Sequence, residues 1–259
     1  MNPVTTSAVP RVSVENLGKA YGNHRVIEGI SLTVEPGQII AIVGPSGVGK
    51  TTLLRSLSGL LPPSSGRVVV GDMPVTEPLP EIGLVFQDYR GSLMPWMSTL
   101  DNVILPLKGK GLSKSERQQR AMDCLADVGL AGKEHKYPWE LSGGMQQRVA
   151  IARALAYDAH VLLMDEPFGS LDAQTRFDLE DLVLDLRRRL GISVIVVTHD
   201  IDEAVYLADR IVVLRGSPAT VIDSVAVDLG AERDQVASKS LPVFAQLRGR
   251  ILNELRHAS

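Results

Sequence analysis

The stretch that decides the fold is QIIAIVGPSGVGKTT, which runs from Gln38 to Thr52. Its first part, QIIAIV, is an apolar run typical of a strand that a sheet buries on both faces. A glycine-rich loop follows, and leucines at helical spacing then predict a helix that ends at PPSSG. These leucines are Leu53, Leu54, Leu57, Leu60 and Leu61. Glycines and a lysine fill a core poorly, so the loop is expected to hold a ligand.

The loop meets the P-loop pattern in full, as Gly44-x-x-x-x-Gly49-Lys50-Thr51. Glycines let backbone N–H groups curl around phosphate oxygens, and the helix N-terminus adds the positive end of its dipole. Lys50 is predicted to reach the β- and γ-phosphates, and Thr51 to offer its hydroxyl to Mg²⁺. The predicted nucleotide-binding residues are Gly44, Pro45, Ser46, Gly47, Val48, Gly49, Lys50, Thr51 and Thr52.

A pair of carboxylates ends a second apolar run, VLLMDEP. Asp165 is predicted to close a buried strand, where a carboxylate holds Mg²⁺ through water in proteins with such a loop. Glu166 follows it, and this position suits a general base that polarises water for attack on the γ-phosphate. The alternative is two solvated acids in a turn.

Strand and helix patterns alternate along most of the chain, which predicts an α/β fold with a largely parallel sheet. RVSVENL and ISLTV alternate like half-buried strands, whereas IGLVF, VLLMD, ISVIVVT and RIVVL indicate buried or core strands. The patterns between Asp88 and Asp158 are mostly helical, as in an insertion. We expect one domain over residues 1–259, with a core at about 11–87 and 159–225, a helical subdomain at about 88–158 and a helical tail at about 240–257.

Helices outside the loop region are predicted from apolar residues that share one face. SKSE, from Ser113 to Glu116, is a capping box that begins one of them, and Gly191 is expected just past the end of another. The apolar faces are Met122, Leu125 and Val128; Met145, Val149, Ala152 and Leu155; Leu179, Leu182, Val183, Leu186 and Leu190; and Phe244, Leu247, Ile251 and Leu255.

The composition limits the classes of molecule that this protein is expected to bind. The net charge of −3 lacks the strong basic excess of nucleic-acid binders. One cysteine, Cys124, excludes an internal disulfide and is expected to be a small buried hydrophobe. No apolar run approaches the roughly 18 residues of a membrane span, and the N-terminus shows no secretory signal. A role at a membrane would therefore require docking on another protein.

The stretch LSGGMQQRVAIARAL, from Leu141 to Leu155, resembles the signature of ATP-binding cassette (ABC) ATPases. The resemblance covers about Val12 to Val213 and includes Gln87 of the Q-loop and His199 of the switch motif. Its D-loop is Ser170, Leu171 and Asp172. The resemblance implies a P-loop NTPase of the ABC ATPase fold, with a mainly parallel core sheet, an antiparallel β subdomain and a helical insertion. It also implies ATP and Mg²⁺ as cofactors.

The family resemblance implies a role for each motif. Two copies pack head to tail, so that the signature of one copy closes on the ATP held by the P-loop of the other. The signature residues are Leu141, Ser142, Gly143, Gly144 and Met145, where Met145 replaces the commoner glutamine. Gln87 senses Mg²⁺ and the attacking water, His199 contacts the γ-phosphate, and Asp172 links the two sites.

Two positions in this comparison are less distinctive. Tyr21 is expected to stack on adenine, although a Tyr-Gly turn also has ordinary structural uses. Ser170 stands where alanine is commonest, and this replacement has no interpretation.

The resemblance is to the ATP-hydrolysing subunits of bacterial importers, in the nitrate, sulfonate and taurine branch. It implies transmembrane permease subunits, a periplasmic or extracellular solute-binding protein, a place on the cytoplasmic face of the inner membrane and no nucleic acid. Trp96 and Leu100 are expected near the groove that meets the permease, unless Trp96 belongs to the core. A small oxyanion is the expected cargo, with a pyrimidine precursor or bicarbonate as alternatives. The alternative function is a soluble ABC ATPase of DNA repair or translation.

Overall fold

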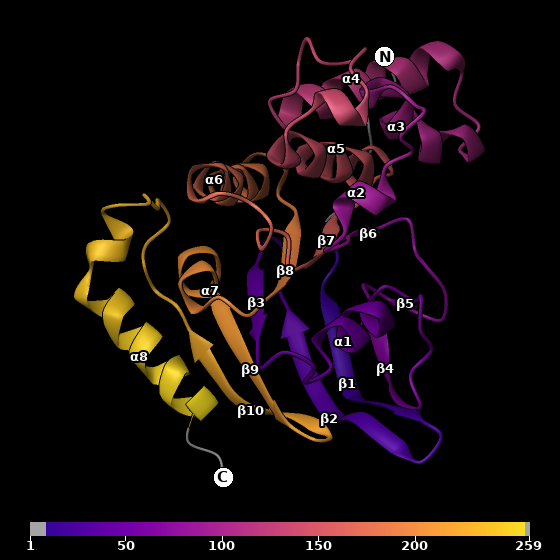
Figure 1. Cartoon of the computed structure of the whole chain (residues 1–259). Helices are drawn as coiled ribbons and strands as arrows, with labels where there is room; N and C mark the ends of the chain where they lie inside the picture. The colour runs from indigo at the N-terminus through magenta and orange to yellow at the C-terminus, as the bar shows by residue number, and fades with distance from the viewer. Residues whose placement is uncertain (1–8, 257–259) are drawn as a thin grey trace.

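The computed structural model describes residues 9–256 (Figure 1). Within them, one ten-stranded mixed sheet has the order β5-β4-β1-β2-β10-β9-β3-β8-β7-β6. The strands are β1 Val12–Tyr21, β2 His24–Val34, β3 Ile39–Val43, β4 Ser65–Val70, β5 Met73–Pro74, β6 Ile82–Val85, β7 Val161–Asp165, β8 Ser193–Thr198, β9 Arg210–Gly216 and β10 Ala219–Ala226. The helices are α1 Lys50–Leu57, α2 Tyr89–Ser92, α3 Thr99–Ile104, α4 Lys114–Asp127, α5 Gly143–Ala156, α6 Ala173–Leu190, α7 Ile201–Leu207 and α8 Pro242–Arg256, with short 3-10 turns at Leu105–Gly109, Pro138–Glu140 and Ser238–Ser240.

Parallel and antiparallel pairing divide the sheet. Strands β9, β3, β8, β7 and β6 pair in parallel, whereas β2, β1, β4 and β5 form an antiparallel ribbon. The turn from β9 into β10 makes an antiparallel pair, and β10 meets β2 through one parallel pairing of Ala219 with Ile27. The predicted fold class, a mainly parallel core with an antiparallel β portion and inserted helices, is confirmed.

Strand β3 shows why the central run of the sequence is apolar without interruption. All five of its residues are buried, and alternate side chains enter two different cores. Ile40 and Ile42 pack with α1 and the antiparallel strands, whereas Ile39, Ala41 and Val43 pack with the layer that contains α5 to α8. The sheet is therefore covered on both faces at β3, and likewise at β7 and β8, whose residues are all buried.

The inserted helices α2 to α5 gather at one end of the molecule (Figure 1). The capping box that begins α4 is confirmed, because Ser113 Oγ accepts from Glu116 N and Glu116 Oε2 accepts from Ser113 N. Cys124 is buried within the core of this layer, as expected. Gly191 follows α6 with a φ of +69°, which is the predicted glycine cap.

The helix after the P-loop ends earlier than the leucine spacing predicts, and Met122 and Leu190 of the predicted apolar faces are exposed. Leu60 is 51% exposed because α1 ends at Leu57 and the chain reverses through Gly59 at a φ of +77°. Met122 is 39% exposed because the buried face of α4 runs through Ala121, Cys124 and Leu125 instead. Leu190 is 38% exposed because it is the last residue of α6, where the helix leaves the layer.

The C-terminal tail packs on the core, as its pattern predicted. Strand β10 continues to Ala226, and α8 then lies along α7 and β9 (Figure 1). Phe244 and Ile251 are fully covered, and Leu247 and Leu255 pack beside them. Across residues 9–256, none of the helices combines the length and apolar character that crossing a bilayer requires.

Candidate nucleotide-binding site

The P-loop connects the end of β3 to the start of α1, as the sequence predicts. Gly49 is the N-cap of α1 with a φ of +112°, a conformation that an L-residue adopts only with strain. Gly44 is required by space, because a Cβ there would lie 2.7 Å from the Leu214 carbonyl oxygen. The loop can therefore keep its shape only with glycine at these two positions.

Lys50 is buried beneath the loop that precedes it. Its ammonium group donates to the carbonyl oxygens of Gly44 at 2.9 Å and Pro45 at 3.0 Å, and lies 3.9 Å from Glu166 Oε1. Burial lowers the pKa of the Lys50 ammonium, and the nearby Glu166 and Asp165 carboxylates oppose that change. A cation buried beneath this glycine-rich loop is well placed to bind an anion that enters the loop.

Asp165 and Thr51 place two oxygen ligands side by side. Thr51 Oγ1 donates to Asp165 Oδ1 at 3.3 Å, across the space between α1 and the end of β7. Burial raises the pKa of the Asp165 carboxyl, opposed by the hydrogen bond from Thr51. Among the described residues no cluster of three or more His, Cys, Asp or Glu could hold a metal. A hydroxyl and a single carboxylate fit Mg²⁺, which takes few protein ligands and completes its shell with water and phosphate.

Glu166 gathers side chains from the ends of three neighbouring strands. Its Oε2 accepts from Gln87 Nε2 at 3.2 Å and lies 3.1 Å from His199 Nδ1. Its backbone has a φ of +43°, which is strained for a residue with a side chain, and its N–H donates to the Val197 carbonyl at 2.8 Å. The strain turns the carboxylate toward the loop, so three residues far apart in the sequence meet at one point.

These groups open onto a pocket of about 380 Å³. It is lined by Val26, Ser46, Gly47, Gly49, Lys50, Thr51, Thr52, Gln87 and Glu166. A second pocket of about 340 Å³ adjoins the other side of the loop and is lined by His24, Val26, Pro45, Ser46, Gly47, Val48, Arg215, Gly216 and Ser217. His24, Val26 and Arg215 are not predicted from the sequence, because no motif marks residues that reach the loop from β2 and from the end of β9.

Tyr21 lies apart from these pockets. It ends β1, is 52% exposed and lines neither of the two cavities beside the P-loop. Lys19 Nζ lies over its ring, 5.4 Å from the ring centre. Stacking of Tyr21 on a base stays a prediction.

The signature residues belong to a different surface. Ser142 is the N-cap of α5, and its Oγ accepts from Met145 N at 3.3 Å. None of Leu141 to Met145 lines either pocket beside the P-loop. Ser142 is exposed to solvent, so this surface and the P-loop pocket are two separate features of one chain.

Gly144 packs against Thr175, in the first turn of the helix that follows the D-loop. A Cβ at Gly144 would lie 2.2 Å from Thr175 Cγ2. Asp172 caps α6 by accepting from Thr175 N at 3.0 Å and from Thr175 Oγ1 at 2.7 Å, which fixes the orientation of that side chain. Ser170 is exposed and Leu171 is buried. Gly144 therefore lets the signature helix α5 approach the first turn of α6 closely.

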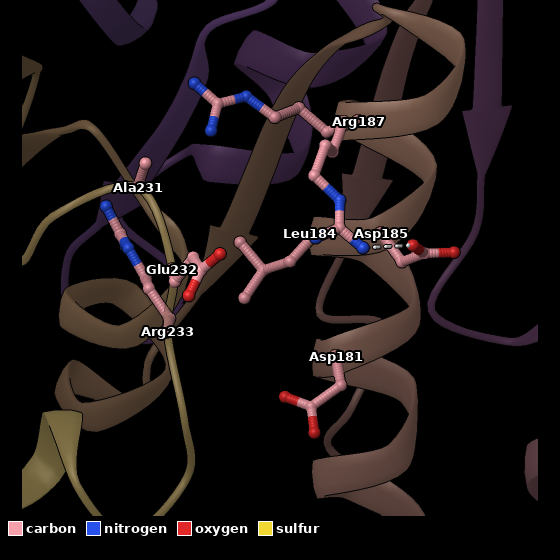
Figure 2. A pocket seen from close by; sticks show the side chains of 8 residues that line it. Asp181, Leu184, Asp185, Arg187, Ala231, Glu232 and Arg233 are labelled. Carbon is pink, nitrogen blue, oxygen red and sulfur yellow. Dashed lines mark hydrogen bonds and ion pairs between the residues drawn. The ribbon is translucent and has the colours of Figure 1, made fainter.

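Another pocket lies away from all of these groups (Figure 2). It measures about 630 Å³ and separates α6 from the segment that carries Glu232 and Arg233. Arg187 donates to the Gly37 carbonyl at 2.7 Å and to Asp209 at 3.0 Å, and Arg233 donates to the Ala208 carbonyl at 3.0 Å. Arg187 thus ties α6 to the sheet, and Arg233 ties the segment after β10 to the residue that follows α7.

The fold and the loop define a P-loop nucleoside triphosphatase. The family model described as ABC transporter matches residues 27–169. The taurine import ATP-binding protein TauB of Pseudomonas fluorescens (strain Pf0-1) is 45% identical over 231 residues, which cover 88% of this chain and 87% of that protein. TauB of Yersinia pestis bv. Antiqua (strain Antiqua) is 41% identical, over 94% of this chain and 96% of its own length. The chain belongs to the ABC transporter family of ATP-binding proteins and is an ATPase.

Solved structures agree with this assignment. The dimeric ATP-binding cassette MJ0796, in a post-hydrolysis state bound to ADP and Pi, superposes with a TM-score of 0.72 and 34% identity over 84% of this chain and 99% of that chain. The cbiO1 protein of Clostridium perfringens, part of the ABC transporter complex cbiONQ, has a TM-score of 0.78 and 30% identity over 95% of each chain.

A buried acid lies directly behind His199. Thr198 Oγ1 donates to Glu203 Oε2 at 2.5 Å, and Arg176 Nη1 lies 3.6 Å from Glu203 and 3.3 Å from Asp200. Burial raises the pKa of the Glu203 carboxyl to about 7, against the hydrogen bond from Thr198. The folded protein therefore keeps a proton on Glu203 that the unfolded chain releases near pH 4.5.

We predict that replacing Gly144 by Ala lowers the free energy of unfolding by about 1–3 kcal/mol, because the new methyl group overlaps Thr175 Cγ2. Adding Thr175→Ser removes that methyl and keeps the hydroxyl on Asp172, so the double variant should recover most of the loss. The free energy of unfolding is measured with denaturant for the wild type, both single variants and the double variant, which together form a double-mutant cycle. Equal stability of Gly144→Ala with and without Thr175→Ser would show that this contact is not limiting.

We predict that Glu203 makes stability fall as the pH rises. The folded carboxyl binds its proton more tightly than the unfolded one, so its contribution is complete below pH 4.5 and is lost as the pH approaches 7. Relative to Glu203→Gln, the wild type should lose about 3 kcal/mol of unfolding free energy between roughly pH 4 and 7.5. Glu232→Gln, an exposed acid, is the control and should parallel the wild type. If the unfolding free energies of the wild type and of Glu203→Gln changed in parallel with pH, Glu203 would not be the group that titrates.

Proposed function

We propose that this chain is the ATP-hydrolysing subunit of a bacterial ABC importer and that it acts as a head-to-tail dimer. The observation that carries the proposal is the meeting of Glu166, Gln87 and His199 beside Lys50, at the mouth of the P-loop pocket. Four groups from separate parts of the chain converge where the terminal phosphate of a bound triphosphate would lie. A structural ion pair alone would not require a strained backbone at Glu166.

The chemistry assigned to these residues is phosphoryl transfer to water. Glu166 accepts a proton from the water whose oxygen attacks the γ-phosphorus, and the bond from that phosphorus to the bridging oxygen of ADP breaks. Lys50 neutralises charge that develops on the phosphate oxygens, and His199 contacts the γ-phosphate. Thr51, Asp165 and Gln87 would hold Mg²⁺, which supplies further charge neutralisation when it is bound.

The dimer assignment rests on the separation of the two ligand-binding features. The amides at the start of α5, capped by Ser142, can bind an anion, yet they line no part of the pocket that holds Lys50. A second copy turned head to tail would bring its Ser142 onto the phosphates in this P-loop. The dimeric, ADP-bound and Pi-bound state of MJ0796 supports this arrangement. Asp172, which holds the Thr175 side chain that packs on Gly144, would link the two sites.

The importer assignment combines an exposed surface with the names of the relatives. Trp96 is 69% exposed, which rules out the core placement, and Leu100 lines a pocket of about 290 Å³ on the inserted helices. Such an aromatic side chain suits the anchor of a permease contact. The TauB relatives favour a small oxyanion such as taurine, another sulfonate or nitrate, delivered by a solute-binding protein. The chain would then work peripherally, on the cytoplasmic face of the inner membrane.

We assign a separate role to each of the three parts that the sequence predicts. Residues at about 11–87 and 159–225 would form the catalytic core, residues at about 88–158 the helical subdomain that meets the permease, and residues at about 240–257 the tail. Closure of the dimer around ATP would move the surface around Trp96, and hydrolysis would reopen it.

We predict that Glu166→Gln retains ATP binding and lowers turnover by about 10²-fold or more, because the amide cannot accept the proton of water. The variant should also accumulate a dimer with bound ATP. Steady-state phosphate release and light scattering measure the two effects, with Glu77→Gln, an exposed acid, as the control. Near-normal turnover of Glu166→Gln would remove Glu166 from the role of base.

A further inference from the structure

The most exposed aromatic surface outside the Trp96 region lies just before the signature. Trp139 belongs to the short turn Pro138–Glu140, is 66% exposed and stacks on Tyr137 with ring centres 4.6 Å apart and planes 10° from parallel. A large indole left in water loses the free energy that burial would give it. Packing within the chain therefore does not account for the exposed face of Trp139, which is available to a ligand.

The turn that carries this stack is held rigidly. Glu140 Oε2 accepts from Tyr137 N at 2.8 Å, and Glu140 Oε1 accepts from Lys136 Nζ at 2.9 Å. From inside the layer, Gln146 Nε2 donates to the carbonyl oxygens of Pro138 at 2.8 Å and of Leu141 at 3.1 Å. The indole is thus presented on a fixed support, which lowers the entropy cost of binding a flat ligand.

The position of the stack relative to the signature suggests the ligand. Ser142 follows Trp139 by three positions, so their Cα atoms lie at most about 11 Å apart. An anion-binding helix start and an aromatic face on one short segment match the two ends of a nucleotide, its phosphates and its base. On the P-loop side, the pocket residues from β2 are His24 and Val26, and Tyr21 is not among them.

We propose that Trp139 stacks on the adenine of the ATP held by the P-loop of the second copy. This inference rests on the proposed head-to-tail dimer, in which the signature of one chain covers the nucleotide of the other. Trp139 would make the site sensitive to the base as well as to the triphosphate, and it would add affinity only when the dimer closes. Base–aromatic stacking of this kind corresponds to a loss of roughly tenfold or more in affinity when the ring is removed.

The chain offers a direct probe, because Trp96 and Trp139 are its only two tryptophans. In the Glu166→Gln background, Trp96→Phe leaves Trp139 as the only indole, and Trp139→Phe leaves Trp96 as the matched control. Titration with ATP and Mg²⁺ should quench Trp139 emission with the same midpoint as the doubling of mass measured by light scattering. The emission of Trp96 should change little over the same range.

Substitution tests the contribution of the ring itself. Trp139→Ala should raise the ATP concentration needed for dimerisation about tenfold, and Trp139→Phe, which keeps an aromatic face, about threefold or less. Circular dichroism and thermal unfolding confirm that both variants fold. Mass doubling with unchanged Trp139 emission and an unchanged midpoint for Trp139→Ala would overturn this inference and leave the proposed dimer intact. Quenching of Trp139 while the protein stays monomeric, or no doubling of mass at all, would overturn the assignment to a second copy.

Discussion

Parallel pairing of β3, β8 and β7 is the constraint on which the site depends. Val43 pairs with Thr198 and Asp165 pairs with Val197, so the carboxyl ends of the three strands lie at one edge of the sheet. The P-loop, the acid pair and His199 each follow one of these ends. Parallel strands need crossover connections, which explains why Lys50 and Glu166 meet in space although they lie more than a hundred positions apart in the chain.

Charged side chains gather at this edge of the sheet, although the protein interior generally excludes charge. Lys50 is buried under its own loop, and its positive charge is balanced by Asp165 and Glu166 at the end of β7. Each of these groups is held by backbone carbonyls or by hydrogen bonds from Thr51 and Gln87, so the charges are fixed before a nucleotide arrives. Such preorganisation is what stabilisation of a developing phosphate charge requires.

Much of the fold and of the site could be predicted from the sequence. The buried strand VLLMD and the P-loop can each be recognised from a few consecutive residues, because such local motifs determine the conformation of their own backbone. The errors lie where local pattern and packing diverge: Leu60 falls past the end of its helix, and Leu190 falls where α6 leaves the core. His24 and Val26 reach the pocket through tertiary folding alone, and the stack of Trp139 on Tyr137 depends on the geometry of a turn.

The central claim is that one ATP site is completed by two chains, and cysteine cross-linking tests it most directly. Cys124 can stay in place, because burial raises the pKa of its thiol to about 11. One Glu166→Gln chain carries Ser46→Cys in the P-loop, and another carries Ser142→Cys in the signature. Mixed with ATP and Mg²⁺ under mild oxidation, they should form a covalent pair of twice 28.0 kDa, which neither chain forms alone. No cross-link in the mixture, or a bond within one chain that carries both cysteines, would contradict the account.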